Sequence, residues 1–257
     1  MNRLVPFTII ESDMEWNLFY TMQTAQEAFR PLAAELAGQY HAASIRPYCV
    51  AIGGPPGSGK SAIAAVLRDM LSETEITAIV LPLDGFHMSN EDLQSTHIIL
   101  GGRSVSLLAL KGASETYDTD RLQESLARLR AGEKFHWPIY SRITHEPSEK
   151  GLPIDNPQAL YLIEGNYLLL QKKPWVSMRL YFDKAIYIAS REGLLKKRIL
   201  MRKMRGGYSG RDARRHFRQS DRRNISIIME HSGNFDYLLE HHGDYSYRYS
   251  CGEASSR

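Results

Sequence analysis

Gly-Gly-Pro-Pro-Gly-Ser-Gly-Lys-Ser, residues 53–61, is the stretch that decides the fold of this chain. It contains the pattern G-x-x-x-x-G-K-S. Its glycines let backbone N–H groups close around phosphate oxygens, its lysine reaches the outer phosphates, and its serine hydroxyl can hold Mg²⁺. The pattern therefore predicts a phosphate-binding loop made of Gly54, Pro55, Pro56, Gly57, Ser58, Gly59, Lys60 and Ser61.

The residues on either side of this loop support the same interpretation. The apolar run 48–52 predicts a buried strand, and residues 62–71 have a helical pattern. The positive N-terminal end of that helix would point at the bound phosphates. Strand, loop and helix in this order predict a nucleotide site.

Further apolar runs without polar alternation follow at residues 77–81, 159–163 and 184–189. Such runs are typical of parallel strands that are covered on both faces. Helical patterns lie between them at 62–71, 119–131 and 192–204. Repeated strand–helix units predict a doubly wound α/β fold of the P-loop NTPase type, with a mainly parallel sheet. Residues 245–250 are expected to add an edge strand.

The first 46 residues are expected to form a helical extension packed on the core. Ser12-Asp13-Met14-Glu15 fits a capping box that opens a helix, and Pro31 is expected to end one helix and begin another. We expect the nucleotide-binding core to span residues 47–250 and a tail to follow at 251–257.

Composition narrows the class of protein. A chain of 257 residues that is 43% hydrophobic can bury a full core. No apolar run approaches the roughly 20 residues needed to cross a bilayer. The N-terminus lacks the pattern of a signal peptide, and two cysteines do not make a disulfide framework. These features predict a cytoplasmic protein with no membrane partner.

Charge is concentrated in one segment. Residues 191–223 carry thirteen Lys and Arg against three Asp and Glu, although the net charge of the chain is only +3. Arg198 and Arg202 are four residues apart and share a helix face. With Gly206-Gly207 after them, they predict a mobile lid over about residues 192–217 that closes on phosphates. A solvated basic face, or contact with a nucleic acid, fits the same run of charge.

Two carboxylates follow predicted strands. Asp84 comes after the strand at 77–81, and Glu164 ends the apolar run 159–163. Ligands of parallel α/β sheets bind beyond the carboxyl ends of the strands. Asp84 is therefore a candidate general base for phosphoryl transfer, and Glu164 is a candidate Mg²⁺ contact together with Ser61. A cap or turn role explains Asp84 equally well from position alone, and a strand-end turn role is the less favoured alternative for Glu164.

A polar and aromatic segment, residues 136–145, is expected to line a substrate pocket. The candidate substrate-binding residues are His87, Tyr140, Arg142 and His145. Arg142 suits an acceptor that carries a carboxylate.

Together these motifs resemble the phosphoribulokinase/uridine kinase family of P-loop kinases. The resemblance rests on the glycine loop, Leu83-Asp84-Gly85-Phe86-His87, residues 111–118, residues 138–145, Ile163-Glu164-Gly165-Asn166 and the Arg198/Arg202 helix. The chain is most similar to bacterial uridine kinase-like and fructose-transport-system kinase-like proteins, with pantothenate kinase similarity around Asp84. The resemblance implies that Asp84 is the base and that Lys60 and Ser61 lie at the nucleotide and Mg²⁺. It places Glu164 near the metal and Arg198 and Arg202 on the lid.

The chain also departs from uridine kinases. They have Ser-Phe-Tyr where this chain has Gly85-Phe86-His87, and Phe and Asp in the region of Ser141 and Arg142. We therefore expect an ATP- and Mg²⁺-dependent kinase that phosphorylates an alcohol of a nucleoside-, pantothenate- or sugar-like metabolite. A P-loop ATPase that binds nucleic acid or regulates a partner is the alternative. We expect no nucleic acid partner, and a homodimer is left open.

Overall fold

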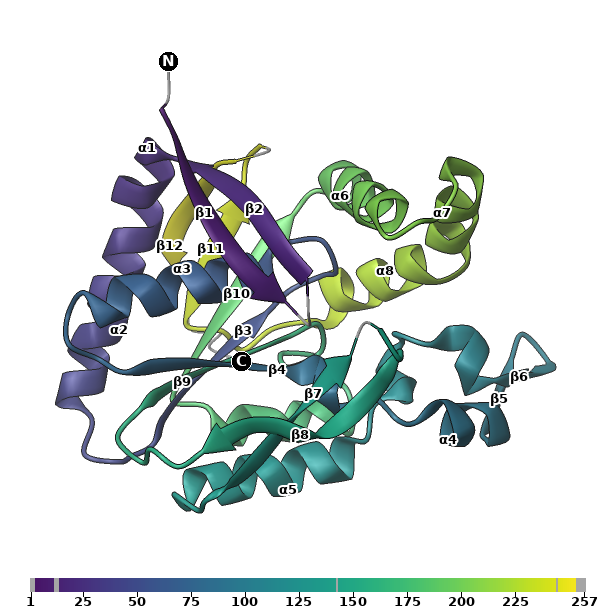
Figure 1. Cartoon of the computed structure of the whole chain (residues 1–257), viewed down its shortest axis with the longest axis horizontal. Coiled ribbons are helices and arrows are strands. Elements are labelled where there is room, and N and C mark those ends of the chain that lie inside the picture. The colour runs from purple at the N-terminus through teal and green to yellow at the C-terminus, as the bar shows by residue number, and fades with distance from the viewer. Residues whose placement is uncertain (1–2, 12–13, 142, 244, 253–257) are drawn as a thin grey trace.

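The computed structural model describes residues 3–11, 14–141, 143–243 and 245–252, and its centre is a six-stranded sheet (Figure 1). The strand order is β12-β11-β10-β3-β9-β4. Neighbours from β11 to β4 are parallel, and β12 runs antiparallel to β11. The strands are β3 (Tyr48–Gly53), β4 (Ala78–Pro82), β9 (Leu160–Gly165), β10 (Lys184–Ser190), β11 (Tyr237–His241) and β12 (Tyr247–Cys251). The predicted α/β class with a mainly parallel sheet is confirmed.

Helices cover both faces of this sheet, which explains why its central strands are apolar without alternation. Val50 and Ile52 of β3 pack with α2 (Arg30–Ala42) and α3 (Lys60–Ser72). The intervening Cys49 and Ala51 pack on the opposite face. There they meet α5 (Thr119–Arg130) and the 3-10 helix η5 (Trp175–Tyr181). Both cysteines are free, Cys49 buried and Cys251 exposed.

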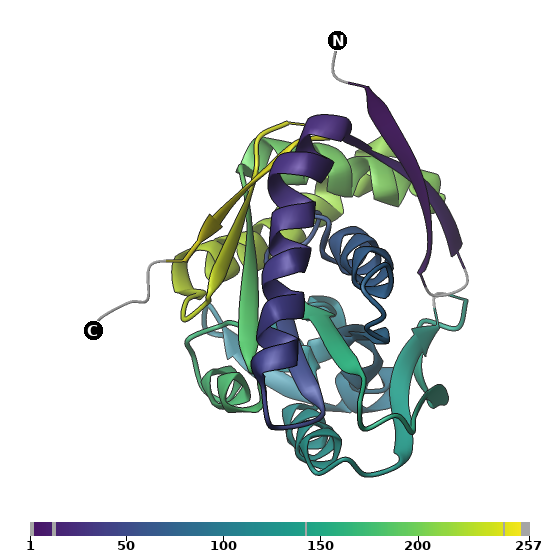
Figure 2. The ribbon, with the colours of Figure 1, turned by 90° about the vertical axis from the view of Figure 1, so that its left-hand side faces the viewer.

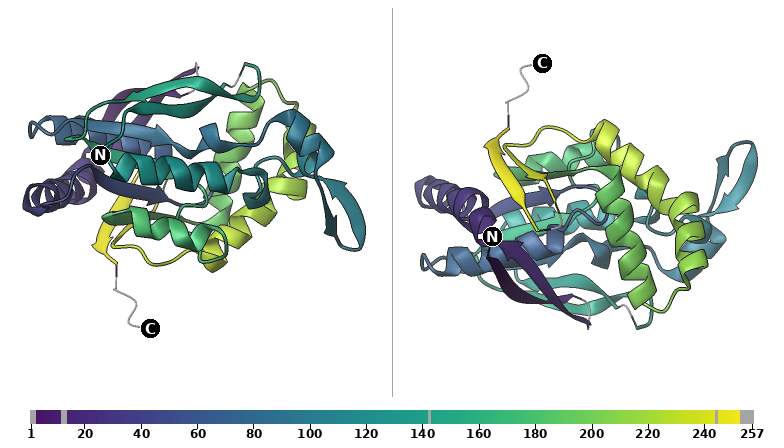
Figure 3. Two further views of the ribbon diagram at one scale, coloured as in Figure 1. Left: turned by 90° about the horizontal axis from the view of Figure 1, so that it is seen from below. Right: turned by 90° about the horizontal axis from the view of Figure 1, so that it is seen from above.

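Two hairpins beside the sheet were not predicted. The first is β7 (Phe135–Ser141) with β8 (Glu146–Ile154), which packs against the 3-10 helix η2 (Leu83–Phe86). The second is β5 (His97–Leu100) with β6 (Arg103–Ser106), which projects from the body in both views of Figure 3. Helix α4 (Asn90–Ser95) and the 3-10 helices η3 (Leu107–Leu110) and η4 (Ser114–Thr116) surround its base.

The basic segment forms a helical subdomain after β10. It consists of α6 (Glu192–Arg205), α7 (Gly210–His216), the π-helical turn η6 (Phe217–Asp221) and α8 (Arg222–His231). Leu195, Ile199, Phe217 and Ile225 give it a small core of its own. Lys203 joins its parts, because its ammonium lies 3.3 Å from a carboxylate oxygen of Asp221.

The expectation of a helix opening at Ser12 is wrong. Residues on both sides form an antiparallel hairpin, β1 (Leu4–Glu11) with β2 (Met14–Thr21), while Ser12 and Asp13 lie outside the described residues. The physical reason is the period of two. Val5, Phe7 and Ile9 pair with Tyr20, Leu18 and Trp16, so large side chains share one face. Figure 2 shows the hairpin on the α3 side of the molecule.

The remainder of the extension is helical. Helix α1 (Met22–Thr24), the π-helical turn η1 (Ala25–Phe29) and α2 follow one another, and every capping residue between them has α-helical dihedrals. Pro31 therefore lies in the first turn of α2 without breaking the helical run. Proline has no backbone N–H, and the π-helical turn η1 before it needs no hydrogen bond from this position. Leu32 and Leu36 bury this helix on the core. Within the described ranges, no helix is long and apolar enough to span a bilayer.

Candidate active site

The glycine loop lies between the end of β3 and the start of α3. Three of its glycines have left-handed backbone, with φ of +154° at Gly54, +82° at Gly57 and +98° at Gly59. A Cβ atom at Gly57 would lie 3.2 Å from the carbonyl oxygen of Leu195 in α6. Helix α6 therefore packs directly on the loop, and only glycine permits this approach without displacement.

Lys60, Ser61 and Glu164 meet at the carboxyl end of the sheet. Ser61 Oγ donates a hydrogen bond of 3.1 Å to Glu164 Oε1, and Lys60 Nζ donates one of 3.1 Å to the carbonyl of Pro55. The sheet sets this geometry, since Glu164 of β9 is in register with Ile52 of β3. Lys60 and Glu164 are both buried.

The donor set fits a nucleotide with Mg²⁺. A hydroxyl and a carboxylate oxygen are the ligand types that Mg²⁺ prefers, and Ser61 and Glu164 present both beside the loop. The loop also contains a buried hydroxyl, Ser58 Oγ, that has no hydrogen-bond partner among the described residues. An anion held by the loop suits such a group, because a buried polar atom without a partner is costly.

Asp84 lies at the same edge of the sheet. Strand β4 is in register with β9 through Pro82 and Glu164, and Asp84 follows two residues later in η2. Tyr117 Oη donates a hydrogen bond of 3.4 Å to Asp84 Oδ1. The three strand ends therefore bring the loop, Glu164 and Asp84 together, as the sequence predicted from their positions.

Gly85 has a packing role that the sequence did not reveal. A Cβ atom there would lie only 2.0 Å from the carbonyl oxygen of Pro138 in β7. Glycine at this position thus lets the β7–β8 hairpin approach η2. The presence of Gly85 is explained by this packing and does not by itself indicate which acceptor is bound.

Aromatic and basic side chains line the region beyond Asp84. The ring of His87 stacks on Tyr117 at 4.0 Å between centroids and lies 5.4 Å from the ring of Tyr140. His87 and Tyr140 are buried. His145 is exposed, and its carbonyl accepts a hydrogen bond of 2.8 Å from Lys111 Nζ. Arg142 lies outside the described residues.

Lys111 is a basic residue of this region that the sequence analysis did not select. Its ammonium lies 5.4 Å from the Tyr140 ring and donates to the side-chain oxygen of Asn90. Burial lowers the pKa of Lys111, and the carboxylate of Glu146 partly opposes this effect. Lys111 and Tyr117 both lie in the 111–118 motif, so that motif was the available signal.

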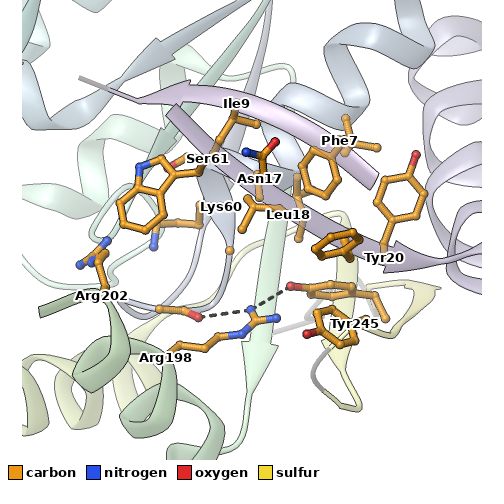
Figure 4. A pocket seen from close by; sticks show the side chains of 18 of the residues that line it. Phe7, Ile9, Asn17, Leu18, Tyr20, Lys60, Ser61, Arg198, Arg202 and Tyr245 are labelled. Carbon is orange, nitrogen blue, oxygen red and sulfur yellow. Dashed lines mark hydrogen bonds between the residues drawn. The ribbon is translucent and has the colours of Figure 1, made fainter. Parts of the chain in front are cut away.

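Arg198 and Arg202 of α6 line a cavity together with Lys60 and Ser61 of the loop (Figure 4). Arg198 donates to Tyr247 Oη at 3.2 Å and approaches the carbonyl of Gly57 at 3.5 Å. Tyr247 Oη in turn donates to the carbonyl of Ser58 at 3.1 Å. Arg202 lines the same cavity as Arg198 and Lys60. No sequence signal identified Tyr247, because β12 reaches the loop only through the sheet order.

Comparison with known proteins agrees with this geometry. Residues 49–223 match the phosphoribulokinase/uridine kinase family. The chain belongs to this family. The predicted family is thus confirmed. Because its members phosphorylate hydroxyl groups of small metabolites, the chain is a small-molecule phosphotransferase with a P-loop ATP site.

Proteins similar to this chain carry different names. The uncharacterized protein YggC of Escherichia coli strain K12 is 30% identical over 83% of this chain and 86% of its own. A pantothenate kinase of Lactococcus lactis strain IL1403 is 31% identical over 61% of this chain, and the match spans about half of that enzyme, 49%.

A solved structure also resembles the fold. It is a fructose transport system kinase candidate from Silicibacter sp. TM1040, with a TM-score of 0.74 and 26% identity. The match covers 84% of this chain and 99% of that one.

Proposed function

We propose that this protein transfers the γ-phosphoryl group of ATP to an alcohol of a small hydroxy acid, with Asp84 as the general base. The observation that carries the proposal is the convergence of Lys60, the Ser61–Glu164 pair and Asp84 at one edge of the sheet. This edge is where parallel α/β sheets bind ligands.

The residues divide the chemistry between them. Asp84 accepts the proton of the acceptor hydroxyl as its oxygen bonds to the γ-phosphorus, and the bond from that phosphorus to the bridging oxygen breaks to release ADP. Lys60 and the loop N–H groups stabilise negative charge on the phosphates. Ser61 and Glu164 would hold Mg²⁺, which when bound neutralises further phosphate charge. Arg198 and Arg202 would act from the lid.

Tyr117 positions the base. Its hydroxyl donates to Asp84 Oδ1, while its ring packs between His87 and Tyr167. A rigid aromatic neighbour fixes the direction of the carboxylate, and proton transfer requires the base within hydrogen-bond reach of the acceptor.

Lys111 favours an acceptor that carries a carboxylate. Its hydrogen-bond partners are the neutral oxygens of Asn90 and His145, in a partly buried setting. The carboxylate of Glu146 acts on Lys111 electrostatically, but the printed hydrogen bonds of its ammonium go to neutral oxygens, so a ligand carboxylate would add a charge-assisted hydrogen bond. Pantothenate, the substrate named for one relative, is a hydroxy acid of this kind. A nucleoside or a free sugar would not offer Lys111 this charge-assisted hydrogen bond.

The test is an ADP-release screen with purified protein and Mg-ATP. Hydroxy acids, nucleosides, free sugars and sugar phosphates are compared at equal concentration, with Asp84→Asn as the blank for each. We expect turnover with a hydroxy acid that Asp84→Asn abolishes. Turnover of phosphorylated or macromolecular acceptors alone, or equal activity of Asp84→Asn, would contradict the proposal.

A further inference from the structure

A cavity of about 340 Å³ lies beside the glycine loop, away from Asp84. Hairpin β1–β2, the start of α3, helix α6 and residues of β12 enclose it. The walls differ in chemistry. The hairpin contributes Phe7, Ile9, Trp16 and Leu18, whereas α6 contributes Lys197, Arg198, Arg202 and Arg205. Figure 4 shows the hairpin side chains Phe7, Ile9 and Leu18 facing Arg198 and Arg202 across the loop.

The sheet order separates this cavity from the acceptor side. Asp84 follows β4, and Glu164 lies near the end of β9; both strands lie on one side of β3. Arg198 follows β10, and Tyr247 belongs to β12, on the other side. A ligand that extends along the loop from its terminal phosphate near Asp84 therefore has its opposite end in the cavity.

The hairpin is built to present an apolar face at this point. Ile9 pairs with Trp16, and Phe7 pairs with Leu18, so the alternating side chains share one face. At its base the hairpin is anchored to the body. Thr21 N donates 3.0 Å to the carbonyl of Tyr245, and Tyr20 packs edge-on against Phe29 at 5.4 Å.

Trp16 is the hairpin residue best suited to a flat ligand. It lies nearer to the turn of the hairpin than Tyr20 does. Its side chain lines the cavity and is half-buried. The other two tryptophans, Trp137 and Trp175, are buried in the core at 0% and 2% exposure. A half-exposed indole over a cavity next to a phosphate site suits stacking on an aromatic base.

We propose that hairpin β1–β2 forms the base-binding wall of the donor-nucleotide site, with Trp16 stacking on the nucleobase. This proposal rests on the proposed role of the glycine loop in binding the phosphates of ATP. It assigns a role to an N-terminal element that lies outside residues 49–223, the region matched to the family. The recognised ligand is an aromatic base attached to a phosphate chain.

Binding of ATP and of inorganic triphosphate to the full chain separates the two roles. Trp16→Ala should weaken ATP binding by about 10-fold, within the range expected for losing one stacked base, and leave triphosphate binding unchanged. Trp16→Phe should retain most of the ATP affinity. Glu15→Gln, at an exposed position of the same hairpin that does not line the cavity, should match the parent chain for both ligands.

Intrinsic fluorescence supplies a second readout. Because Trp137 and Trp175 are buried, ATP should change the emission of Trp16, inorganic triphosphate should not, and Trp16→Phe should lose the response.

The outcomes distinguish the hairpin from the loop. Unchanged or tighter ATP binding by Trp16→Ala would overturn the hairpin proposal, as would an equal loss of both ligands in a variant whose melting curve is unchanged. Emission that does not respond to ATP would also overturn it. Lys60→Ala should weaken both ligands. If it weakens neither, the proposed phosphate role fails, whatever the hairpin variants show.

Discussion

The two halves of the site are constructed in different ways. The phosphate side uses the consecutive residues 53–61 and one carboxylate, Glu164, from the neighbouring strand. The acceptor side that we propose is assembled from side chains of separate segments, among them Asp84, Lys111, Tyr117 and Tyr140. One half depends on local backbone geometry, and the other depends on how distant segments pack.

This difference explains how one fold serves several substrates. Phosphoryl transfer needs the same charges in the same places, so the phosphate side is constrained by the reaction. The acceptor side can change by single side chains or by the approach of the β7–β8 hairpin, which Gly85 permits. The relatives reported above, a pantothenate kinase and a fructose transport system kinase candidate, carry names with different substrates and fit such a division.

The largest effect is expected where the two halves meet, at Asp84. Asp84→Asn keeps the size of the side chain but cannot accept the acceptor's proton, so kcat should fall by about 10²–10⁴. ATP affinity should persist, because the loop is untouched. Single-turnover kinetics with titrated ATP measures both quantities. Transfer that survives within a factor of a few would mean that Asp84 is only a turn residue of η2.

On the phosphate side, the strongest single contribution should come from Lys60. Lys60→Ala removes a fixed charge from the transferring group and should lower kcat by about 10²–10³, the usual cost of losing one such donor. The KM for the acceptor should change little. Lys172→Ala removes an exposed lysine and serves as the matched control. If Lys60→Ala and Lys172→Ala have equal kinetics, Lys60 does not take part in catalysis.

Lys111 tests the acceptor side alone. Lys111→Met should raise the KM for a carboxylate acceptor by about 10- to 100-fold, because a charge-assisted hydrogen bond is lost, and leave ATP binding unchanged. Burial lowers the pKa of Lys111, so its positive charge is lost at lower pH than that of an exposed lysine. Acceptor affinity should therefore decline early as pH rises.

The pH profile of Lys111→Met is the control, since this decline should be absent from it. If Lys111→Met raises the KM for neutral acceptors as much as the KM for carboxylate acceptors, the carboxylate assignment is contradicted.

The smallest effect is expected in the helical subdomain formed by α6, α7, η6 and α8. Burial raises the pKa of Asp221, but the hydrogen bond from His216 and the charge of Lys203 outweigh burial, so its pKa is lowered overall. A carboxylate with a lowered pKa stabilises the folded state above its unfolded pKa, and this stabilisation is lost as pH falls through the folded pKa. Asp221→Asn should lower the stability of this helical subdomain by about 1–3 kcal/mol at neutral pH.

Hydrogen exchange of α6 amides measures this effect, expressed as protection factors across pH. Protection should fall on acidification in the parent chain and should be low and flat in Asp221→Asn. Asp212→Asn breaks an exposed pair with Arg215 and should have little effect. Unchanged α6 protection factors in both variants would show that the small apolar core alone stabilises this helical subdomain.

The sequence predicted the parts of this molecule that are coded locally. The glycine loop, the apolar runs of β3, β4, β9 and β10, and the helices α3, α5 and α6 were all predicted close to their observed bounds. The positions of Asp84 and Glu164 at strand ends followed from the same reasoning, because parallel strands end at one edge. Strand β11 was not predicted, because it has only five residues and some of them are polar.

The sequence misled where local propensity and tertiary pairing compete. A capping-box pattern predicted a helix at Met14, yet the pairing of Trp16 with Ile9 and Leu18 with Phe7 made this segment a strand. Propensity differs by less than a kcal/mol per residue, and cross-strand packing outweighs it.

Only the tertiary structure decided which distant residues share the site. Residues 53–61 sufficed to identify a phosphate loop, because backbone conformation depends on a few adjacent residues. The contact of Tyr247 with Ser58, the placement of Lys111 by Tyr140, and the hairpin wall beside the loop all depend on sheet order and packing. Those contacts join residues far apart in the chain, and their free energy comes from burial that no single segment achieves alone.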